Sequence, residues 1–222
     1  MGLFDKFKKK PAVETPPEEE LEAPGWDAIT AAFEKLYPDQ KSPKHYGTLI
    51  KWRFGGNDPL DGISIYETDA YWHFVTYGLS ELYEKETEDK EYSGYGMEFT
   101  FKLKKTGNAN EEAEIRCICG ILQSIARVTF TKGELFYADE YLYTGQTTGI
   151  DSRAASNITG FITAADPALP PIDTPFGRVE FVEFIGATDA ELRAVIDKEL
   201  TVLQLREKLG TDITCYDRPS VV

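Results

Sequence analysis

The sequence predicts an α+β fold, a single layered domain in which helices pack against a mixed β-sheet. Two observations favour this class. Segments with helical and with strand periodicity are interspersed irregularly along the chain, rather than separated or strictly alternating. Hydrophobic residues make up 41% and aromatic residues 13% of the 222 positions. That is enough apolar surface for one buried core, and it excludes a wholly disordered chain.

The first 24 residues differ in composition from the rest. Residues 1–10 are basic and carry three large apolar side chains, Leu3, Phe4 and Phe7. Residues 11–24 are dominated by Pro and Glu, which bury too little apolar surface to order a chain. We therefore expect residues 1–24 to form a disordered leader. A small amphipathic anchor on an anionic membrane is the alternative for residues 1–10. The folded domain is expected to span residues 25–222.

The first half of this domain reads as one helix followed by strands. Apolar residues recur at helical spacing from Trp26 to Tyr37, and Pro38 ends the run. Three segments rich in β-branched and aromatic residues are then expected to be strands, Thr48–Phe54, Ile63–Tyr66 and Trp72–Tyr77. Met97–Leu103 alternates apolar and polar residues without a break, which is typical of a strand with one solvent-exposed face.

A second helix is expected over Glu111–Thr129, where the apolar residues fall on one helical face and Asn110 is placed to cap the start. Three candidate strands follow, Glu134–Tyr143, Asn157–Ala164 and Val179–Gly186, and the turn Pro170–Gly177 joins the last two.

The C-terminal part is predicted to hold one long helix. Thr188-Asp-Ala-Glu191 forms a capping box at its start, and Gly210 is expected to close it. Ile213–Tyr216 is a candidate terminal strand.

Charge and cysteine usage limit the classes of function. The formal net charge is −14, which argues against nucleic-acid binding because phosphate contacts need clustered Lys and Arg. The charge favours a basic partner, or simply solubility. Three cysteines with no signal peptide indicate reduced thiols and a cytoplasmic location: Cys117, Cys119 and Cys215. No apolar run approaches the roughly 18 residues needed to span a bilayer, so no membrane span is expected.

The sequence contains no recognisable catalytic or metal-binding motif, and we predict a non-enzymatic protein with no cofactor and no metal. His73 stands between Trp72 and Phe74 in a predicted strand, where a hydrogen-bonded structural histidine is favoured over a catalytic base. A hydrolase using His73 with Asp58 or Asp61 is the competing hypothesis. Cys117 and Cys119 would point about 200° apart on a helix and do not form a ligand pair.

Carboxylates concentrate in two runs that flank the predicted aromatic strand. Glu81–Glu91 holds six carboxylates and two lysines, and Asp58–Asp69 holds four carboxylates and no base. Such runs are either solvated loops or part of a recognition surface. Six neighbouring tyrosines favour recognition, because tyrosine provides contact area at low entropic cost: Tyr66, Tyr71, Tyr77, Tyr83, Tyr92 and Tyr95.

Several long motifs, taken in order, resemble the N-terminal domain of Suppressor of fused over about residues 25–220. They are Leu36-Tyr-Pro-Asp-Gln40, Gly55-Gly-Asn-Asp-Pro-Leu-Asp61, Trp72-His-Phe-Val-Thr-Tyr-Gly-Leu-Ser-Glu-Leu-Tyr83, Ser93-Gly-Tyr-Gly-Met-Glu-Phe-Thr-Phe-Lys-Leu103 and Thr174-Pro-Phe-Gly177. The resemblance implies a non-enzymatic regulator. In animals this family binds Gli-type transcription factors, and the bound peptide adds as a strand in a cleft between two domains.

This sequence ends about where the first of those two domains would end, so half of the cleft is expected to lie outside it. Single-domain relatives of this kind are typical of bacteria, where the family is associated with immunity proteins that neutralise toxins. The resemblance makes Tyr83 the counterpart of a peptide-contacting tyrosine, and Asp89 the counterpart of a contacting aspartate in a shortened loop.

The expected function is therefore a protein-binding module, of immunity or antitoxin type, that meets a basic toxin domain. A peptide-binding adaptor that acts by strand addition at a sheet edge is the alternative. Six residues are the predicted partner-binding set: Tyr83, Asp89, Glu86, Glu88, Tyr77 and Tyr92.

Overall fold

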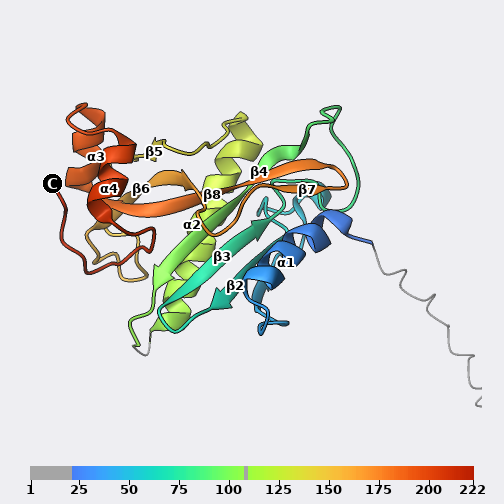
Figure 1. The fold of residues 1–222 in the computed structure, drawn as a ribbon, viewed down its shortest axis with the longest axis horizontal. Helices are drawn as coiled ribbons and strands as arrows, with labels where there is room; N and C mark the ends of the chain where they lie inside the picture. Colours follow the sequence, from blue (N-terminus) through green and yellow to red (C-terminus); the bar gives the residue numbers. More distant parts are fainter. Residues whose placement is uncertain (1–21, 108–109) are drawn as a thin grey trace, which may run out of the picture.

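The fold is a mixed eight-stranded sheet with helices on both faces and at one end (Figure 1). The computed structural model describes residues 22–107 and 110–222. The strands are β1 (Lys44–Gly47), β2 (Gly62–Glu67), β3 (Tyr71–Tyr77), β4 (Tyr92–Lys104), β5 (Tyr141–Leu142), β6 (Ile158–Ala165), β7 (Ile172–Thr174) and β8 (Gly177–Thr188). The helices are α1 (Pro24–Leu36), α2 (Glu111–Lys132), α3 (Asp189–Ile196) and α4 (Val202–Leu209), with a short 3-10 helix η1 (Trp52–Phe54). The predicted α+β class is confirmed.

Most strand neighbours are antiparallel, and one pair is parallel. The order across the sheet is β1-β2-β3-β4-β8-β6-β5, and β7 pairs with β8 beside this path. The parallel pair is β4 with β8, in the middle of the sheet. This order leaves β1 and β5 as the two edges.

Helix α2 covers one face of the sheet and α1 covers the other. The buried apolar stripe of α2 packs on Phe74, Phe99 and Phe184, which belong to the larger core cluster. Ile29 and Phe33 of α1 are completely buried against the second face. Both predicted helices are confirmed. Asn110 stands at the start of α2, but its side chain donates to Glu114 and Ser152 and makes no capping hydrogen bond.

The sheet face that α1 covers is buried, so β4 has no solvent-exposed side, contrary to the prediction. Its polar residues Glu98, Thr100 and Lys102 are at most 2% exposed. Each of them is hydrogen-bonded. Glu98 accepts from Thr76, Gly78 and Ser80, while Thr100 and Lys102 donate to the carboxylate of Asp166. The alternating pattern was therefore read correctly as a strand, and its polar half faces a buried hydrogen-bond network.

His73 belongs to the same buried network, as its structural interpretation requires. Its Nδ1 lies 2.8 Å from the Tyr37 hydroxyl and its Nε2 lies 2.8 Å from Asp166 Oδ2. Burial lowers the pKa of His73, although the hydrogen bond to Asp166 acts in the opposite direction. His73 is completely buried, and Asp58 and Asp61 are not among its partners. This geometry supports a structural histidine.

Two strand predictions and one turn prediction were wrong in extent. The segment Thr48–Phe54 forms a turn and η1, and β1 precedes it at Lys44–Gly47. Its apolar residues Leu49, Ile50 and Phe54 are exposed, so they do not pack against the sheet. Ile213–Tyr216 contributes only one bridge, from Thr214 to Leu103. The predicted turn Pro170–Gly177 contains the short strand β7.

The predicted C-terminal helix is two helices. The capping box of Thr188 and Glu191 is present at the start of α3, and Gly210 closes α4 with φ 64°. Between them the chain turns at Lys198, whose φ is 62°, and a second capping box of Thr201 and Gln204 starts α4. The second box is the reason that one long helix does not form.

Candidate protein-binding surfaces

The edge strand β5 offers unpaired backbone groups. It pairs only with β6, through Tyr141 with Ile162 and Leu142 with Phe161. The Thr163 amide donates to the Glu140 carbonyl, which makes 140 and 163 a hydrogen-bonded pair. Because hydrogen-bonded and non-hydrogen-bonded pairs alternate in an antiparallel ladder, the N–H and C=O of Tyr141 point away from β6. They face the open edge of the sheet.

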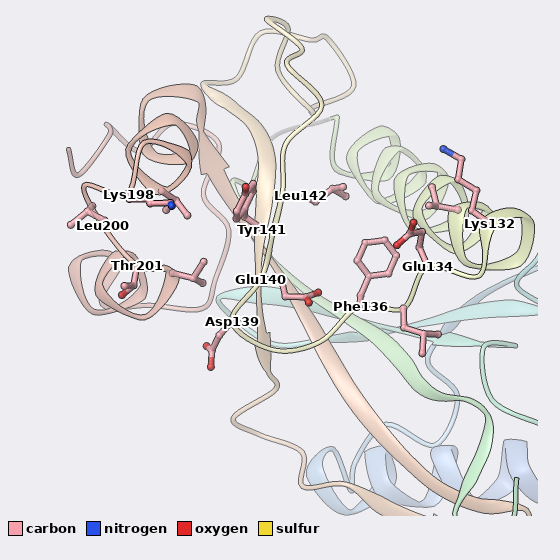
Figure 2. Close-up of a pocket in the computed structure, with 14 residues that line it drawn as sticks. Lys132, Glu134, Phe136, Asp139, Glu140, Tyr141, Leu142, Lys198, Leu200 and Thr201 are labelled. Carbon is pink, nitrogen blue, oxygen red and sulfur yellow. The ribbon is translucent and has the colours of Figure 1, made fainter.

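A groove of ≈ 930 Å³ lies beside this edge, between the end of α2 and the α3–α4 turn. Figure 2 shows β5 in its middle, with Lys132, Glu134 and Phe136 on one side and Lys198, Leu200 and Thr201 on the other. We call it the β5 groove. Its full lining is Val128, Lys132, Glu134, Leu135, Phe136, Asp139, Glu140, Tyr141, Leu142, Val195, Lys198, Leu200, Thr201 and Val202.

Apolar side chains dominate the groove and charges surround them. Tyr141 is 46% exposed and Leu135 is 37% exposed, which is a high exposure for large apolar residues. Lys132 and Lys198 have no salt-bridge partner among the described residues, whereas Asp139 pairs with Arg206 at 2.8 Å. An apolar floor with isolated charges at its rim is the usual composition of a peptide-binding groove.

Two residues of the groove have unusual backbone geometry. Within the described ranges, three non-glycine residues have positive φ, and two of them, Asp139 (66°) and Lys198 (62°), line this groove. Such conformations cost free energy and are concentrated at ligand sites, where the surrounding structure holds them. The strain therefore marks the same place as the open edge and the cavity.

Sequence reasoning did not single out this groove. It expected a strand over Glu134–Tyr143, but only two residues of that segment pair with β6. The rest of the segment passes over the end of α2. The run of Leu135, Phe136 and Tyr137 beside Tyr141 and Leu142 was the available signal, and it was interpreted as strand periodicity. The α3–α4 turn that forms the other wall was hidden in the predicted long helix.

The predicted partner-binding residue Tyr83 lies at a second pocket and is held by two charged side chains. Its hydroxyl donates to Asp61 at 2.8 Å, and it accepts a hydrogen bond from Lys51. The Lys51 ammonium also lies 3.8 Å from the centre of the Tyr83 ring and 3.1 Å from Asp61. Burial raises the pKa of the Tyr83 phenol. The ring is half-buried, and its contacts fix its orientation.

The pocket at Tyr83 has a volume of ≈ 340 Å³ and aromatic walls. Trp52 and Tyr95 lie 5.6 and 5.2 Å from the ring of Phe130, measured between ring centres. Leu79 and Leu82 also line it, and Glu84 and Glu86 stand among its lining residues. We call it the aromatic pocket.

Residues 84–91, the acidic loop, hold the other predicted charges. Hydrogen bonds and an ion pair to nearby carboxylates hold the loop in place. The carboxylate of Glu81 accepts from the amides of Glu86 and Thr87, and the Lys85 ammonium binds Glu81 at 2.9 Å. Asp89 accepts from the amides of Glu91 and Tyr92, which lower its pKa. Glu86, Glu88 and Asp89 are exposed, and no cation in the described ranges pairs with them.

Tyr77 and Tyr92 are placed differently. Tyr77 is 1% exposed, and its ring stacks on Trp26 at 4.0 Å beneath α1. It presents no side-chain surface to a partner in this structure and can only support the site. Tyr92 is partly exposed at the end of the acidic loop, where its ring would lie 2.9 Å from a Cβ on Gly96.

The second predicted acidic run does not join this surface. Asp58 and Asp61 precede β2, whereas Glu67 and Asp69 lie at its other end, about 20 Å away at 3.3 Å per residue. Three of the four are neutralised by neighbours: Asp58 by Arg127, Asp61 by Lys51 and Glu67 by Lys105. The ten carboxylates therefore do not form one face, and the unpaired charge is concentrated in the acidic loop.

Among the described residues, no group of three or more His, Cys, Asp or Glu side chains is arranged to hold a metal ion. The three cysteines are free, and the Cys117 thiol donates to the Ile150 carbonyl. Among the described helices, none combines the length and the apolar character that crossing a membrane requires.

An α+β domain with an open sheet edge, a groove beside it and an aromatic pocket has the features of a protein-binding module. The family model of the Suppressor of fused protein matches residues 56–219. The chain belongs to the Suppressor of fused family.

The relatives cover this chain well but are often longer. The Suppressor of fused homologs of Homo sapiens and Mus musculus are each 31% identical over 183 residues. The match covers 77% of this chain and 37% of either relative, so the chain spans little more than a third of their length.

Solved structures show the same fold. The Sufu chain of a Sufu–Fu complex superimposes with a TM-score of 0.78 at 30% identity, over 90% of this chain and 93% of that one. Drosophila Suppressor of Fused gives 0.77 at 30% identity, over 90% of this chain and 52% of that one. A homolog from Neisseria gonorrhoeae gives 0.54 at 14% identity, over 89% and 97%, which is a likeness of fold alone.

Proposed function

We propose that this chain is a non-enzymatic binding module that takes an extended peptide as an added strand along β5. The observation that carries the proposal is the outward-facing N–H and C=O of Tyr141 beside the β5 groove. An added strand would satisfy these backbone groups and place alternate side chains on the apolar floor of the groove.

The comparisons support binding, without supplying the partner. The Sufu chain that resembles this one was solved in a complex with Fu, so a close relative binds a protein. The β5 groove gives affinity through main-chain hydrogen bonds and selects side chains through Phe136, Leu142 and Leu200. We propose that the partner segment carries apolar residues at alternate positions.

The proposal is tested by selecting peptides from a random display library on the full chain and measuring their affinity for two variants. Tyr141→Pro removes the outward N–H, and proline is tolerated at an edge strand when its missing donor faces solvent. Tyr141→Phe keeps the backbone and the ring, so it is the matched control. We expect Tyr141→Pro to weaken binding about tenfold, the value of one buried hydrogen bond, and Tyr141→Phe to leave it nearly unchanged.

Equal affinity of the two variants and the parent chain, with both variants folded, would exclude strand addition at β5. Selected peptides whose affinity is unaffected by changes in the β5 groove but falls on charge reversal of the acidic loop would show that the binding site is at Tyr83.

A second candidate is an immunity-type protein of the cytoplasm that neutralises a basic toxin domain. The unpaired carboxylates of Glu86, Glu88 and Asp89 favour it, because charges on an exposed rim steer association. Capture of the partner from the native cell, followed by expression of that partner with and without this chain in a test host that the partner alone kills, tests the role. Survival of cells that co-express both proteins supports it, and death despite stable expression of this chain contradicts it.

A further inference from the structure

The aromatic pocket lies on the opposite side of α2 from the β5 groove. Phe130 lines the pocket and Val128 lines the groove, and residues two apart on a helix point about 200° apart. A ligand of the β5 groove therefore does not fill the aromatic pocket. Half-buried Tyr83 and Trp52 line it together with the buried apolar residues Leu79 and Leu82.

The rim of the pocket is negatively charged. Glu84 and Glu86 line it, and the acidic loop continues with Glu88, Asp89 and Glu91. The ammonium of Lys85 is already engaged by Glu81 and by the carbonyls of Tyr92 and Phe176. An apolar pocket with an acidic rim fits a segment that combines aromatic and basic residues.

The N-terminal part of the chain leaves the fold at the base of this pocket. The amide of Gly25 donates to the carbonyl of Leu82 at 3.0 Å, and Leu82 is part of the pocket lining. The approach is so close that a Cβ on Gly25 would lie 2.0 Å from the carbonyl oxygen of Glu81. The residues before Gly25 therefore begin next to the acidic loop.

Residues 3–10, Leu-Phe-Asp-Lys-Phe-Lys-Lys-Lys, have the matching composition, although they lie outside the described residues. They carry three large apolar side chains and four lysines in a chain whose net charge is −14. Fourteen residues, 11–24, connect them to Gly25 and can span up to about 48 Å at 3.4 Å per residue. A tether of this length gives an effective concentration in the millimolar range, so even weak contacts are occupied.

We infer that residues 3–10 occupy the aromatic pocket of their own molecule, with Leu3, Phe4 and Phe7 as apolar anchors and the lysines on the acidic loop. The chain then covers its own acidic face until a basic partner displaces the segment. This occupation is independent of the β5 groove. It shares the acidic loop with the toxin-binding candidate, but its test needs no partner.

The test is photo-cross-linking within the full chain. Phe7 is replaced by p-benzoylphenylalanine, the protein is irradiated as a dilute monomer, and the intramolecular cross-links are mapped by peptide mass spectrometry. We expect most of them in the pocket walls and the acidic loop, at residues 52, 79–95 and 130. Glu86→Lys with Glu88→Lys and Asp89→Lys should reduce their yield about tenfold, because three favourable charge contacts become repulsive.

The matched control reverses three exposed carboxylates near the α3–α4 turn, Asp197→Lys with Glu199→Lys and Glu207→Lys. It has the same change in net charge and should leave the cross-links unchanged. A synthetic peptide of residues 1–10, added in excess, should compete with them.

Cross-links spread over the surface, equal yields for both triple variants, or a main site in the β5 groove would overturn the inference. Loss of the cross-links on addition of anionic vesicles would also overturn it, because residues 3–10 would then bind the membrane and act as an anchor. Circular dichroism of each variant confirms that the fold is retained.

Discussion

Lys102 is the cation on which the buried network of β4 depends. It is 2% exposed, and its ammonium lies 2.9 Å from Asp166, 3.1 Å from Glu183 and 2.7 Å from Asp212. Burial would lower the pKa of Lys102, but the three carboxylates outweigh it and raise the pKa. Lys102→Met keeps most of the side-chain length and removes the ammonium with its charge and its hydrogen bonds to Asp166 and Asp212.

The magnitude follows from what is left behind. Asp212 is partly exposed and can be hydrated, whereas Asp166 and Glu183 are completely buried. Burial raises the pKa of Glu183, which favours its neutral form, so Asp166 is the buried partner that keeps a charge without its cation. Removing one partner of a buried pair costs about 3–5 kcal/mol. For a domain of this size, 1 kcal/mol shifts the melting temperature by about 2–4 °C, so we expect a drop of roughly 6–20 °C. Urea titration and calorimetry measure both quantities.

Two further variants and a pH series make the result specific. Lys105→Met breaks an exposed pair with Glu67 and should cost at most about 1 kcal/mol. Adding Asp166→Asn to Lys102→Met removes the stranded charge and should recover about half of the loss.

Burial would raise the pKa of Asp166, but the hydrogen bond from His73 and the charge of Lys102 hold it below its ordinary value. Its stabilising contribution is therefore present above about pH 4 and lost on acidification, and the cost of Lys102→Met should shrink as the pH falls below 4. A loss under about 1 kcal/mol, or no recovery in the double variant, would refute this reasoning.

Three other variants have defined outcomes. Burial raises the pKa of Glu98 to about 7. The free energy of unfolding should therefore fall by about 1.4 kcal/mol for each unit that the pH rises between about 4.5 and 7. Glu98→Gln should flatten that slope in urea titrations. Thr201→Ala removes the capping box of α4 and should cost about 1 kcal/mol, and an unchanged melting temperature would show that the cap contributes nothing. Gly94 has φ 56°, and a Cβ there would lie 2.8 Å from the Leu79 carbonyl, so Gly94→Ala should cost more than about 1 kcal/mol, whereas Gly120→Ala, which meets no atom within 4 Å, should not destabilise the fold.

Segments with strong local periodicity were predictable from the sequence. The helices at Trp26–Tyr37 and Glu111–Thr129 and the strands at Ile63–Tyr66, Trp72–Tyr77 and Met97–Leu103 were found because apolar spacing alone specifies them. What covers each face of β4 was not predictable, because the second face is closed by α1 and by Asp166, both distant in sequence.

The surfaces were harder to predict than the elements. The acidic loop was recognised from its composition, and its residues Glu86, Glu88 and Asp89 have no cationic partner among the described residues. The acids of Asp58–Asp69 could not be assigned correctly, because their neutralising partners Lys51, Lys105 and Arg127 come from other segments. The β5 groove was missed because its walls, α2 and the α3–α4 turn, meet only in the folded chain.

The central claim is that β5 receives an added strand, and the backbone amide of Tyr141 reports on it most directly. Its hydrogen exchange is measured by NMR in the free chain and in the complex with a peptide selected on the full chain. An amide that faces the open edge should exchange readily when free. We predict that its protection rises at least about tenfold in the complex, because the peptide carbonyl accepts its hydrogen. Unchanged exchange at Tyr141, with new protection confined to residues 81–95, would contradict the account and place the bound peptide at the aromatic pocket.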